Sequence, residues 1–413
     1  LTMTYALKDP QSLPLDSIDV SNPDLYLHDT WRPWFARLRK DDPVHWTENA
    51  AFGGFWSVTR FEDIVSVDKN HDGFSSEPAI TIGDYGNDLP VRQFIAMDPP
   101  IHDVQRKAVQ GVVAPRNLAN LESLIRQRVV DMLEGLPVGE AFDWVEHVSV
   151  NLTTQMLATI FDFPFDDRAK LPYWSDMATS LPEIAGGDGD NDARTRALTE
   201  CLETFTALWH ERKTNPPGTM DLISLMATNP DTAQMVDNPL EYLGNIILLI
   251  VGGNDTTRNS ITGGVLALNE NPEQYAKLKA NPQLVSSLVP EIIRWQTPLM
   301  HMRRLATKDI ELGGKLIRKG DKVVMWYLSG NHDETAIDQP NRFIIDRENP
   351  RFHLSFGFGI HRCMGNRLGE MQLRILWEEI LQRFSHVEVV GEPVRVQSNF
   401  VRGYESMSVI LHR

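Results

Sequence analysis

The sequence has very little cysteine and no long apolar run. Its 413 residues include just Cys201 and Cys363, which excludes a disulfide framework and fits a reducing cytosol. The most apolar stretch, Ile246 to Val251, is far shorter than the roughly 20 residues of a membrane span. The first residues, through Gln11, contain no apolar run typical of a signal peptide. We therefore expect a cytoplasmic protein with no membrane span.

Positive charge is also scarce. The chain carries 40 basic and 56 acidic residues, a net charge of −16, which argues against nucleic acid or an anionic membrane surface as the main partner. No Gly-x-Gly-x-x-Gly fingerprint for a flavin or nicotinamide is present. There is no solenoid repeat and no low-complexity linker, so we expect residues 1–413 to form a single domain.

Helical patterns dominate what is present. Apolar residues recur every three or four positions over Leu118 to Leu136 and over Thr195 to Arg212. Strand-like segments are shorter, and they are Trp56 to Thr59 (before a helix-like Phe61 to Val67), Asp309 to Tyr327 and Val387 to Leu411. The glycine- and aspartate-rich stretch from Ala185 to Asp192 predicts a mobile surface loop. The pattern favours a mainly α fold with small β-sheets.

One predicted helix is unusually long. Asn238 is placed to cap it, Pro239 occupies its first turn, and Glu241 completes a capping box. The helical pattern continues to about Asn269, and a helix of ~31 residues would be about 46 Å long. Its middle contains Gly252 and Gly253, each costing roughly 1 kcal/mol relative to alanine. Such penalties in a buried segment indicate a functional role.

Cys363 lies in a glycine-rich loop, Phe356 to Gly365, directly before an amphipathic helix. A lone cysteine is most often a small buried hydrophobe. A zinc site needs about four ligands, and the nearby candidates are only His353, His361 and Cys363 itself. A cysteine hydrolase needs a histidine base and an oxyanion hole, to which nothing in the sequence points. A thiolate as axial ligand of haem iron needs one cysteine in a rigid loop, and this option uses every feature of the loop.

The loop resembles the haem-binding signature of the cytochrome P450 superfamily. Three more segments resemble motifs of that family in the same order, and they are Gly252 to Thr257, Glu291 to Arg294, and Asn331 to Asp333 followed by Pro340, Phe343, Asp346 and Arg347. The resemblance runs from Trp31 to the C-terminus. It implies a cytochrome P450 fold, with haem between the long central helix and the cysteine loop, and an O2-dependent monooxygenase.

The resemblance also assigns roles around haem b (iron protoporphyrin IX). It makes Cys363 the metal ligand. It places haem contacts at Gly252, Phe356, His102, Arg106, Arg304 and His361, the last four at the propionates, with Arg304 favoured over Arg303. Arginine's fixed fork suits such carboxylates.

Asp255 and Thr256 are the expected catalytic pair. A hydroxyl beside the iron can hold an ordered water, and the adjacent acid can relay protons from outside. The alternative, a hydroxyl bonded back to the preceding helical turn, accounts for Thr257 but not for the glycines and the aspartate together. Glu291 and Arg294 are expected to be structural, with Arg347 as a third member.

Longer strings resemble the soluble bacterial hydroxylases of medium-chain alkanes and fatty acids. They are Gly252 to Ser260, Glu291 to Pro298, Arg362 to Leu381 and Gln397 to Tyr404. This resemblance implies hydroxylation at a terminal C–H bond in a narrow apolar tunnel. Expected wall residues are Leu248, Val251, Leu299, Met300, Met302, Ile95, Phe400 and Val401. Segments 79–94 and 181–192 are expected to influence the preferred chain length.

Electrons are expected from a 2Fe–2S ferredoxin and an NAD(P)H-dependent ferredoxin reductase. Basic residues that suit an acidic partner are Arg351, Arg362, Arg367, Arg106, Lys107 and Arg116, although solvated charges and haem contacts explain them equally well. Two other functions stay open from the sequence. One is a P450 hydroxylase of a terpenoid or steroid, and the other is a haem sensor or carrier without turnover, which the acid–alcohol pair argues against.

Overall fold

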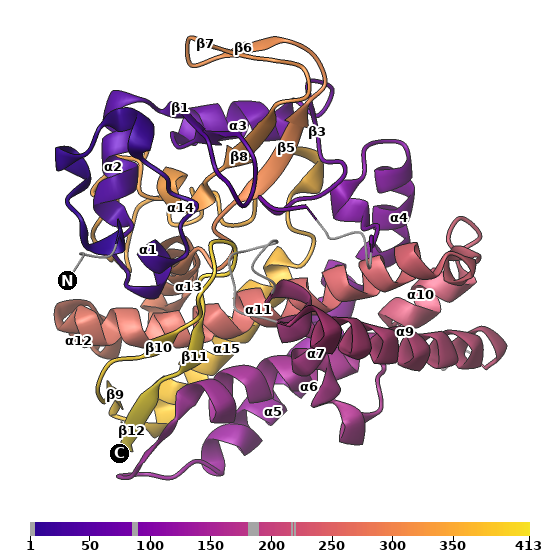
Figure 1. The fold of residues 1–413 in the computed structure, drawn as a ribbon. Helices are drawn as coiled ribbons and strands as arrows, with labels where there is room; N and C mark the ends of the chain where they lie inside the picture. Colours follow the sequence, from indigo (N-terminus) through magenta and orange to yellow (C-terminus); the bar gives the residue numbers. More distant parts are fainter. Residues whose placement is uncertain (1–4, 85–89, 181–189, 216–217, 219) are drawn as a thin grey trace.

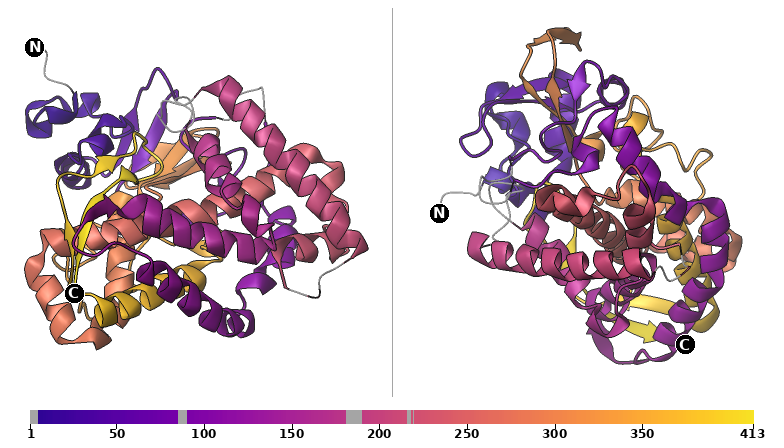
Figure 2. Two further views of the ribbon diagram at one scale, coloured as in Figure 1. Left: turned by 90° about the horizontal axis from the view of Figure 1, so that it is seen from below. Right: turned by 90° about the vertical axis from the view of Figure 1, so that its right-hand side faces the viewer.

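A computed structural model describes residues 5–84, 90–180, 190–215, 218 and 220–413. Helices make up most of the molecule, and a small twisted sheet lies to one side of them (Figure 1). The right-hand view of Figure 2 shows the sheet above the main body of helices. The prediction of a mainly α fold with small β-sheets is confirmed.

The helices vary from single turns to very long segments. Their bounds are α1 Asp24–Leu27, α2 Arg32–Asp41, α3 Phe61–Lys69, α4 Ile101–Val109, α5 Pro115–Glu134, α6 Asn151–Phe161, α7 Lys170–Thr179, α9 Asn191–Thr214, α10 Leu222–Thr228, α11 Pro239–Glu270, α12 Pro272–Ala280, α13 Val285–Gln296, α14 Tyr327–Gly330 and α15 Asn366–Arg383. The strands are β1 Val44–Thr47, β2 Phe55–Val58, β3 Phe74–Ser75, β4 Ala141–Asp143, β5 Met302–Ala306, β6 Ile310–Leu312, β7 Lys315–Ile317, β8 Lys322–Met325, β9 His386–Val389, β10 Val394–Arg395, β11 Tyr404–Ser406 and β12 Ser408–His412.

The largest sheet described has the order β1-β2-β8-β5-β3. Strands β2 and β8 run parallel, with Trp56 opposite Val323, and the other neighbours are antiparallel. β8 is buried along its whole length, as expected for a strand inside a sheet that is covered on both faces. The remaining strands form β4-β12-β9 and the pairs β6-β7 and β10-β11.

Helix α11 runs through the centre of the molecule, and it has 32 residues (Figure 1). It starts at Pro239, whose missing N–H costs nothing in a first turn. The expected capping box is wrong in detail. The Asn238 side chain accepts no hydrogen bond from the helix start; it donates to Glu241 Oε2 at 3.4 Å, while Glu241 Oε1 accepts a hydrogen bond from Gln105 at 2.7 Å.

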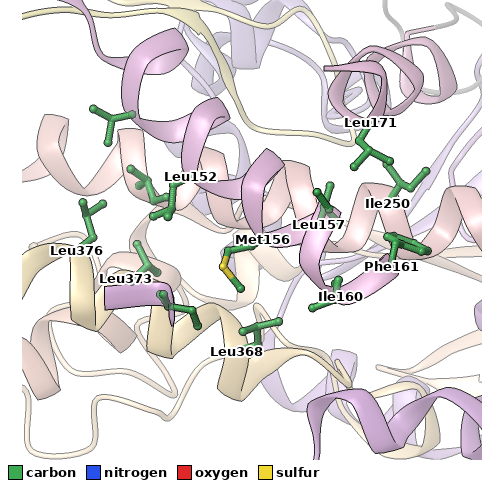
Figure 3. Packing of buried hydrophobic residues seen from close by; sticks show 14 of the residues in the cluster. Leu152, Met156, Leu157, Ile160, Phe161, Leu171, Ile250, Leu368, Leu373 and Leu376 are labelled. Atoms are coloured by element: carbon green, nitrogen blue, oxygen red, sulfur yellow. The ribbon is translucent and has the colours of Figure 1, made fainter. Parts of the chain in front are cut away.

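The main hydrophobic core surrounds α11. Figure 3 shows Leu152 and Met156 of α6 facing Leu368 and Leu373 of α15, while Leu157 of the same helix lies toward α11. Burying such side chains is worth roughly 1.5–3 kcal/mol each. This packing fixes α6, α11 and α15 relative to one another, and it therefore fixes the loop that immediately precedes α15.

Most expected elements are present with small shifts. Helix α9 covers the predicted segment from Thr195 to Arg212, α5 covers the other predicted segment as far as Glu134, and α15 follows the cysteine loop. The predicted strand region that starts at Asp309 ends in β8, and Tyr327 begins α14 instead. Residues 181–189 lie outside the described residues, and with them most of the predicted loop up to Asp192. Among the described helices, none has the length and apolar character needed to cross a membrane.

Candidate active site

Two left-handed glycines shape the loop that carries Cys363. Gly357 and Gly359 have φ values of 67° and 66°, a region that only glycine adopts readily. A Cβ added to Gly359 would lie 2.6 Å from the carbonyl oxygen of Asp68. The Cys363 N–H closes the loop by donating to the Phe356 carbonyl at 2.7 Å. The sequence of this loop therefore dictates one backbone path.

The Cys363 thiol faces an internal cavity. Burial inside the fold raises the pKa of the thiol, whereas hydrogen bonds from the backbone of Gly365 and Asn366 and the charges of Arg106 and Arg362 act in the opposite direction. Backbone donors and nearby cations of this kind stabilise a thiolate. The sulfur is thus presented to the cavity by a rigid loop whose backbone donors and cations partly offset the rise in its pKa.

Asp68, at the end of α3, connects this loop to the sheet. Its Oδ2 accepts hydrogen bonds from the Phe358 N–H at 2.8 Å and from the Tyr327 hydroxyl at 2.7 Å. Its Oδ1 pairs with the Arg304 guanidinium at 2.7 Å, and both side chains are almost completely buried. Sequence reasoning missed Asp68, because a single acid within an ordinary amphipathic helix carries no signal of its distant partners.

The cavity above Cys363 encloses about 2120 Å³ of empty space, part of it open to solvent. Apolar side chains supply most of its wall, and polar groups are confined to a few places. Of the residues expected at the cofactor or the oxygen site, those that line it are Gly252, Thr256, Arg106, Arg304, Phe356, His361 and Cys363.

Arg106, Arg304 and His361 gather at one side of the cavity. Arg106 donates to the carbonyl of Arg362 at 2.6 Å, and Ser76 lies 2.9 Å from His361 Nε2. His102 does not line the cavity; its ring packs 4.2 Å from the ring of His361. His361 Nδ1 and His102 Nε2 are buried without a hydrogen-bond partner.

Arg303 points elsewhere, because its guanidinium pairs with Asp84. The preference for Arg304 over Arg303 therefore agrees with the geometry. Burial and the positive charges of Arg304, His102 and Arg106 lower the pKa of His361 to about 2, so this imidazole is neutral and able to donate one hydrogen bond.

The middle of α11 forms the wall that carries Gly252 and Thr256. A Cβ added to Gly252 would meet nothing within 4 Å, whereas one on Gly253 would approach Leu157 Cδ2 to 2.7 Å. The two glycines thus have different uses: Gly252 leaves open space at the cavity, and Gly253 permits close packing of α6. The Thr256 hydroxyl donates to the Gly252 carbonyl at 2.7 Å. The back-bonded arrangement expected for Thr257 is therefore made by Thr256.

Asp255 faces away from the cavity, into the protein. Its Oδ1 lies 3.2 Å from the Ser175 hydroxyl and 3.0 Å from Arg258 NH2. Arg258 NH2 is also 2.5 Å from Asp176, whose side chain is 51% exposed. Burial raises the pKa of the Asp255 carboxyl to about 6, despite the opposing charge of Arg258. A chain of polar groups thus leads from the surface to the residue beside Thr256.

Sequence reasoning missed Arg258 and Asp176. The spacing of Asp255 and Arg258, three residues apart on one helix, is a signal for the first contact. The second contact crosses from α11 to α7, and no spacing in the sequence indicates it.

Most of the expected substrate residues line the cavity. They are Ile95, Leu248, Val251, Leu299, Met302 and Phe400. Two expected residues do not line it. Met300 is fully buried in a separate cluster that contains Val324 and Trp326, because its backbone N–H is held by the Phe400 carbonyl at 2.8 Å. Val401 forms a β-bridge with Leu299 and belongs to a small buried cluster with Ile80, Ala96 and Phe400. Part of segment 79–94 does reach the cavity, through Ile80, Thr81, Val91, Gln93 and Phe94.

Glu291 and Arg294 form a fully buried, two-pronged ion pair, with N–O distances of 2.8 and 2.9 Å. Arg347 joins them at 2.9 Å from Glu291, which confirms it as the third member. Arg294 also donates to the Asn331 carbonyl at 2.7 Å. The Asn331 side chain in turn accepts from the Leu354 N–H at 2.6 Å. The ion pair therefore supports the segment that leads into the cysteine loop, and a solvated surface pair is excluded.

The residues of the site fit haem b. A single presented thiolate suits an axial position on iron. The open space at Gly252 would accommodate a group lying over Cys363. Arg106, Arg304 and the buried, unpartnered nitrogens of His102 and His361 are donors suited to two propionates. The fold and the site thus define a haem-thiolate protein.

Comparison with known proteins agrees with this class. Residues 121–407 match the model of the family described as Cytochrome P450. The structure is similar to that of CYP153D17 from Sphingomonas sp. PAMC 26605, with a TM-score of 0.90 and 44% identity over 97% of this chain and 100% of that one.

Curated relatives cover nearly the whole chain. Linalool 8-monooxygenase of Pseudomonas putida is 34% identical over 95% of this chain and 98% of its own length. A methyl-branched lipid omega-hydroxylase of Mycobacterium bovis is 32% identical over 97% of this chain and 96% of its own length. The chain belongs to the cytochrome P450 family. It is a haem-dependent P450 monooxygenase, so a haem carrier without turnover is not retained as its function.

Proposed function

We propose that this P450 hydroxylates a terminal C–H bond of a medium-chain alkane or fatty acid. The observation that carries the proposal is one cavity whose wall combines the Cys363 thiol with apolar side chains of Leu248, Val251, Leu299 and Phe400. A flexible hydrocarbon chain is the ligand class that such a wall binds through the hydrophobic effect. The omega-hydroxylase name of a relative supports the terminal position.

Bound haem supplies oxygen activation at an iron ligated by Cys363. The protein positions the group: Arg106, Arg304, His102 and His361 would hold its propionates. The apolar wall excludes water and would direct the end of the chain toward the open space at Gly252.

Asp255 would deliver protons to the oxygen site. Its carboxyl has a pKa raised to about 6 by burial, so both of its protonation states are populated near neutral pH. Asp176 and Arg258 lead from solvent to this carboxyl. Thr256, the next residue, lines the cavity, and its hydroxyl would pass the proton on by exchanging its hydrogen bond to Gly252 for one to an ordered water.

Electrons would come from a ferredoxin and its NAD(P)H-dependent reductase, as is general in bacterial P450s. Exposed cations near the cysteine loop support docking of an acidic partner, and they are Arg351, Arg362, Arg367, Lys107 and Arg116. Arg351 is paired with Glu370 at 3.1 Å, and this pairing reduces the contribution of Arg351 to the docking of an acidic partner. Arg106 is directed to the cavity and to the loop, so we assign it to haem.

A terpenoid is the second candidate substrate, because linalool 8-monooxygenase is a relative over nearly the full length. The two candidate substrates differ in the shape of the molecule that the apolar wall would bind. A terpenoid is branched and short, whereas a medium-chain alkane or acid is straight.

The test is titration of the purified holoenzyme, followed by the spin shift of the haem. Octane, octanoate, dodecanoate and linalool are compared at equal ionic strength, and products of reconstituted turnover are identified by mass spectrometry. A straight-chain ligand with the lowest Kd and a terminal alcohol as product supports the proposal. Preferential binding and turnover of linalool contradicts it.

A further inference from the structure

His301 is completely buried directly behind the cavity wall. Its side chain is 0% exposed, and Met302, the residue after it, is the first residue of β5. His301 is not among the described residues that line the cavity, whereas Leu299 and Met302 on either side of it are. Burying a polar ring is costly unless its nitrogens are hydrogen-bonded, so the partners of the ring show what His301 does there.

Both ring nitrogens of His301 bond to the backbone, and the two partners belong to different segments of the chain. Nδ1 lies 3.0 Å from the carbonyl oxygen of Asn399, and Nε2 lies 3.1 Å from the backbone nitrogen of Ile82. Because a carbonyl only accepts and an N–H only donates, Nδ1 carries the proton and Nε2 accepts. Burial lowers the pKa of His301 to about 3, so the neutral ring keeps both hydrogen bonds at neutral pH.

The segment that contains Ile82 forms one part of the wall, since Ile80 lines the cavity. The Ile80 carbonyl accepts a hydrogen bond from the Arg303 N–H of β5 at 2.7 Å. The Ile82 carbonyl accepts one from Lys322 of β8 at 2.8 Å. The bond from the Ile82 N–H to His301 completes the attachment of this segment to the sheet.

The segment that contains Asn399 supplies Phe400 to the same wall. The His301 ring packs edge-on against the Phe400 ring, with 5.2 Å between the centroids, and against the Trp326 ring, with 4.9 Å. Phe400 and Ile80 belong to one small buried cluster. One side chain behind the wall therefore holds both segments that supply these two wall residues.

We propose that His301 is a positioning residue that sets how Ile80 and Phe400 lie in the wall, and thereby which carbon of a bound chain reaches the oxygen site. This inference rests on the proposed terminal hydroxylation. Ligand affinity comes mainly from the apolar area of the wall, to which His301 does not contribute. The rate at one carbon depends on its position, and a displacement of about 1 Å can cost roughly 100-fold. Loss of His301 should therefore change the product more than it changes binding.

Three variants separate the two hydrogen bonds of His301 from the packing of its ring. His301→Phe keeps an aromatic ring and removes both bonds. The amide of His301→Asn lies near the position of Nδ1, so it can still donate to the Asn399 carbonyl. The longer side chain of His301→Gln reaches the position of Nε2, so it can still accept from the Ile82 N–H.

His45→Phe is the matched control. His45 is also buried, at 2% exposure, and both of its ring nitrogens are hydrogen-bonded, to Asp42 at 2.9 Å and to the Ile18 carbonyl at 3.0 Å. None of these three residues is among the described residues that line the cavity. This variant therefore reports what the loss of a buried histidine does to folding without a change in the wall.

Each holoenzyme is titrated with dodecane and with dodecanoate, using the spin shift of the haem. The products of reconstituted turnover are identified by gas chromatography and mass spectrometry. Urea denaturation measures the stability of each variant, and the carbon monoxide spectrum of the reduced protein verifies that the haem is ligated by thiolate.

His301→Phe should lower kcat for the terminal alcohol by roughly 10- to 100-fold, and subterminal alcohols should become the main products. The Kd of dodecane should change less than about fivefold, since the apolar wall is kept. His301→Asn and His301→Gln should each restore part of the terminal product, because each keeps one of the two bonds. His45→Phe should lower the urea midpoint and leave the product distribution of the wild type.

The wild-type product distribution in His301→Phe overturns the proposal, and so does the same shift of product in His45→Phe. If His301→Phe does not fold, an unchanged product distribution in both His301→Asn and His301→Gln overturns it. Failure of the proposed function looks different, because the wild-type holoenzyme itself then makes no terminal alcohol, and the inference falls with it.

Discussion

Replacing Asp68 by alanine should strongly destabilise the protein and weaken haem retention. The carboxylate pairs with the buried Arg304 at 2.7 Å and accepts hydrogen bonds from Tyr327 and from the Phe358 N–H. Removing one partner of a buried ion pair costs about 3–5 kcal/mol, and each orphaned donor adds about 1–3 kcal/mol. Because the contacts share one group, the costs are not additive. We expect a loss of at least ~4 kcal/mol in the free energy of unfolding.

Urea denaturation of the holoenzyme measures this loss, and the carbon monoxide spectrum measures the fraction that retains thiolate-ligated haem. Asp72→Ala is the matched control, because the Asp72 side chain is 87% exposed and exposed substitutions usually stay within about 0.5 kcal/mol. Asp68→Asn keeps an acceptor but removes the charge, so it should be intermediate. If the free energy of unfolding of Asp68→Ala lies within about 1 kcal/mol of the wild-type value, Asp68 does not hold the cysteine loop and Arg304 together.

Four other substitutions have clear expected outcomes. Asp255→Asn should slow oxygen-dependent turnover far more than it weakens substrate binding. Wild-type turnover should fall as the pH rises through about 6, because the pKa of the Asp255 carboxyl is raised to that value and the protonated fraction decreases. The turnover of Asp255→Asn should not change over this pH range. If the variant shows the same fall in turnover as the wild type, Asp255 is not the proton relay. Gly252→Ala should raise the free energy of unfolding by up to about 1 kcal/mol, since alanine favours a helix and its Cβ meets nothing within 4 Å. Gly253→Ala should gain less free energy of unfolding than Gly252→Ala, because the added Cβ approaches Leu157. Equal urea midpoints for the two variants would contradict the different uses of these two glycines. Glu291→Gln should cost about 3–5 kcal/mol in urea denaturation by leaving its arginine partners unpaired, and a loss below about 1 kcal/mol would refute the scaffold role.

The parts of the fold that the sequence predicts are those with local causes. Helix α11 carries a proline at its start and a long apolar first half, and the cysteine loop depends on glycines with left-handed backbone at Gly357 and Gly359. Strand β5 was not predicted, because its sequence contains Arg303 and Arg304 and does not read as a buried strand. Both arginines are buried because each pairs with an acid that comes from a distant part of the chain.

The same limit applies to the site. Cys363 and Thr256 line one cavity as expected, since each motif carries its own chemistry. The contact of Asp68 with the Phe358 N–H joins residues 290 positions apart, and no local pattern encodes it. Met300 was expected in the wall because it is apolar and adjacent to Leu299. Which side chain enters the cavity depends on how that backbone pairs with residues 400 and 401, and composition does not specify this pairing.

The most direct test of the account is the position of the hydroxyl group in the product. The holoenzyme is reconstituted with a ferredoxin, its reductase, NAD(P)H and O2, and it is given dodecanoate and octane in separate reactions. Analysis by gas chromatography and mass spectrometry should show the alcohol at the terminal carbon as the main product. Mainly subterminal alcohols, or no turnover of straight chains while linalool is hydroxylated, would contradict terminal hydroxylation of linear substrates.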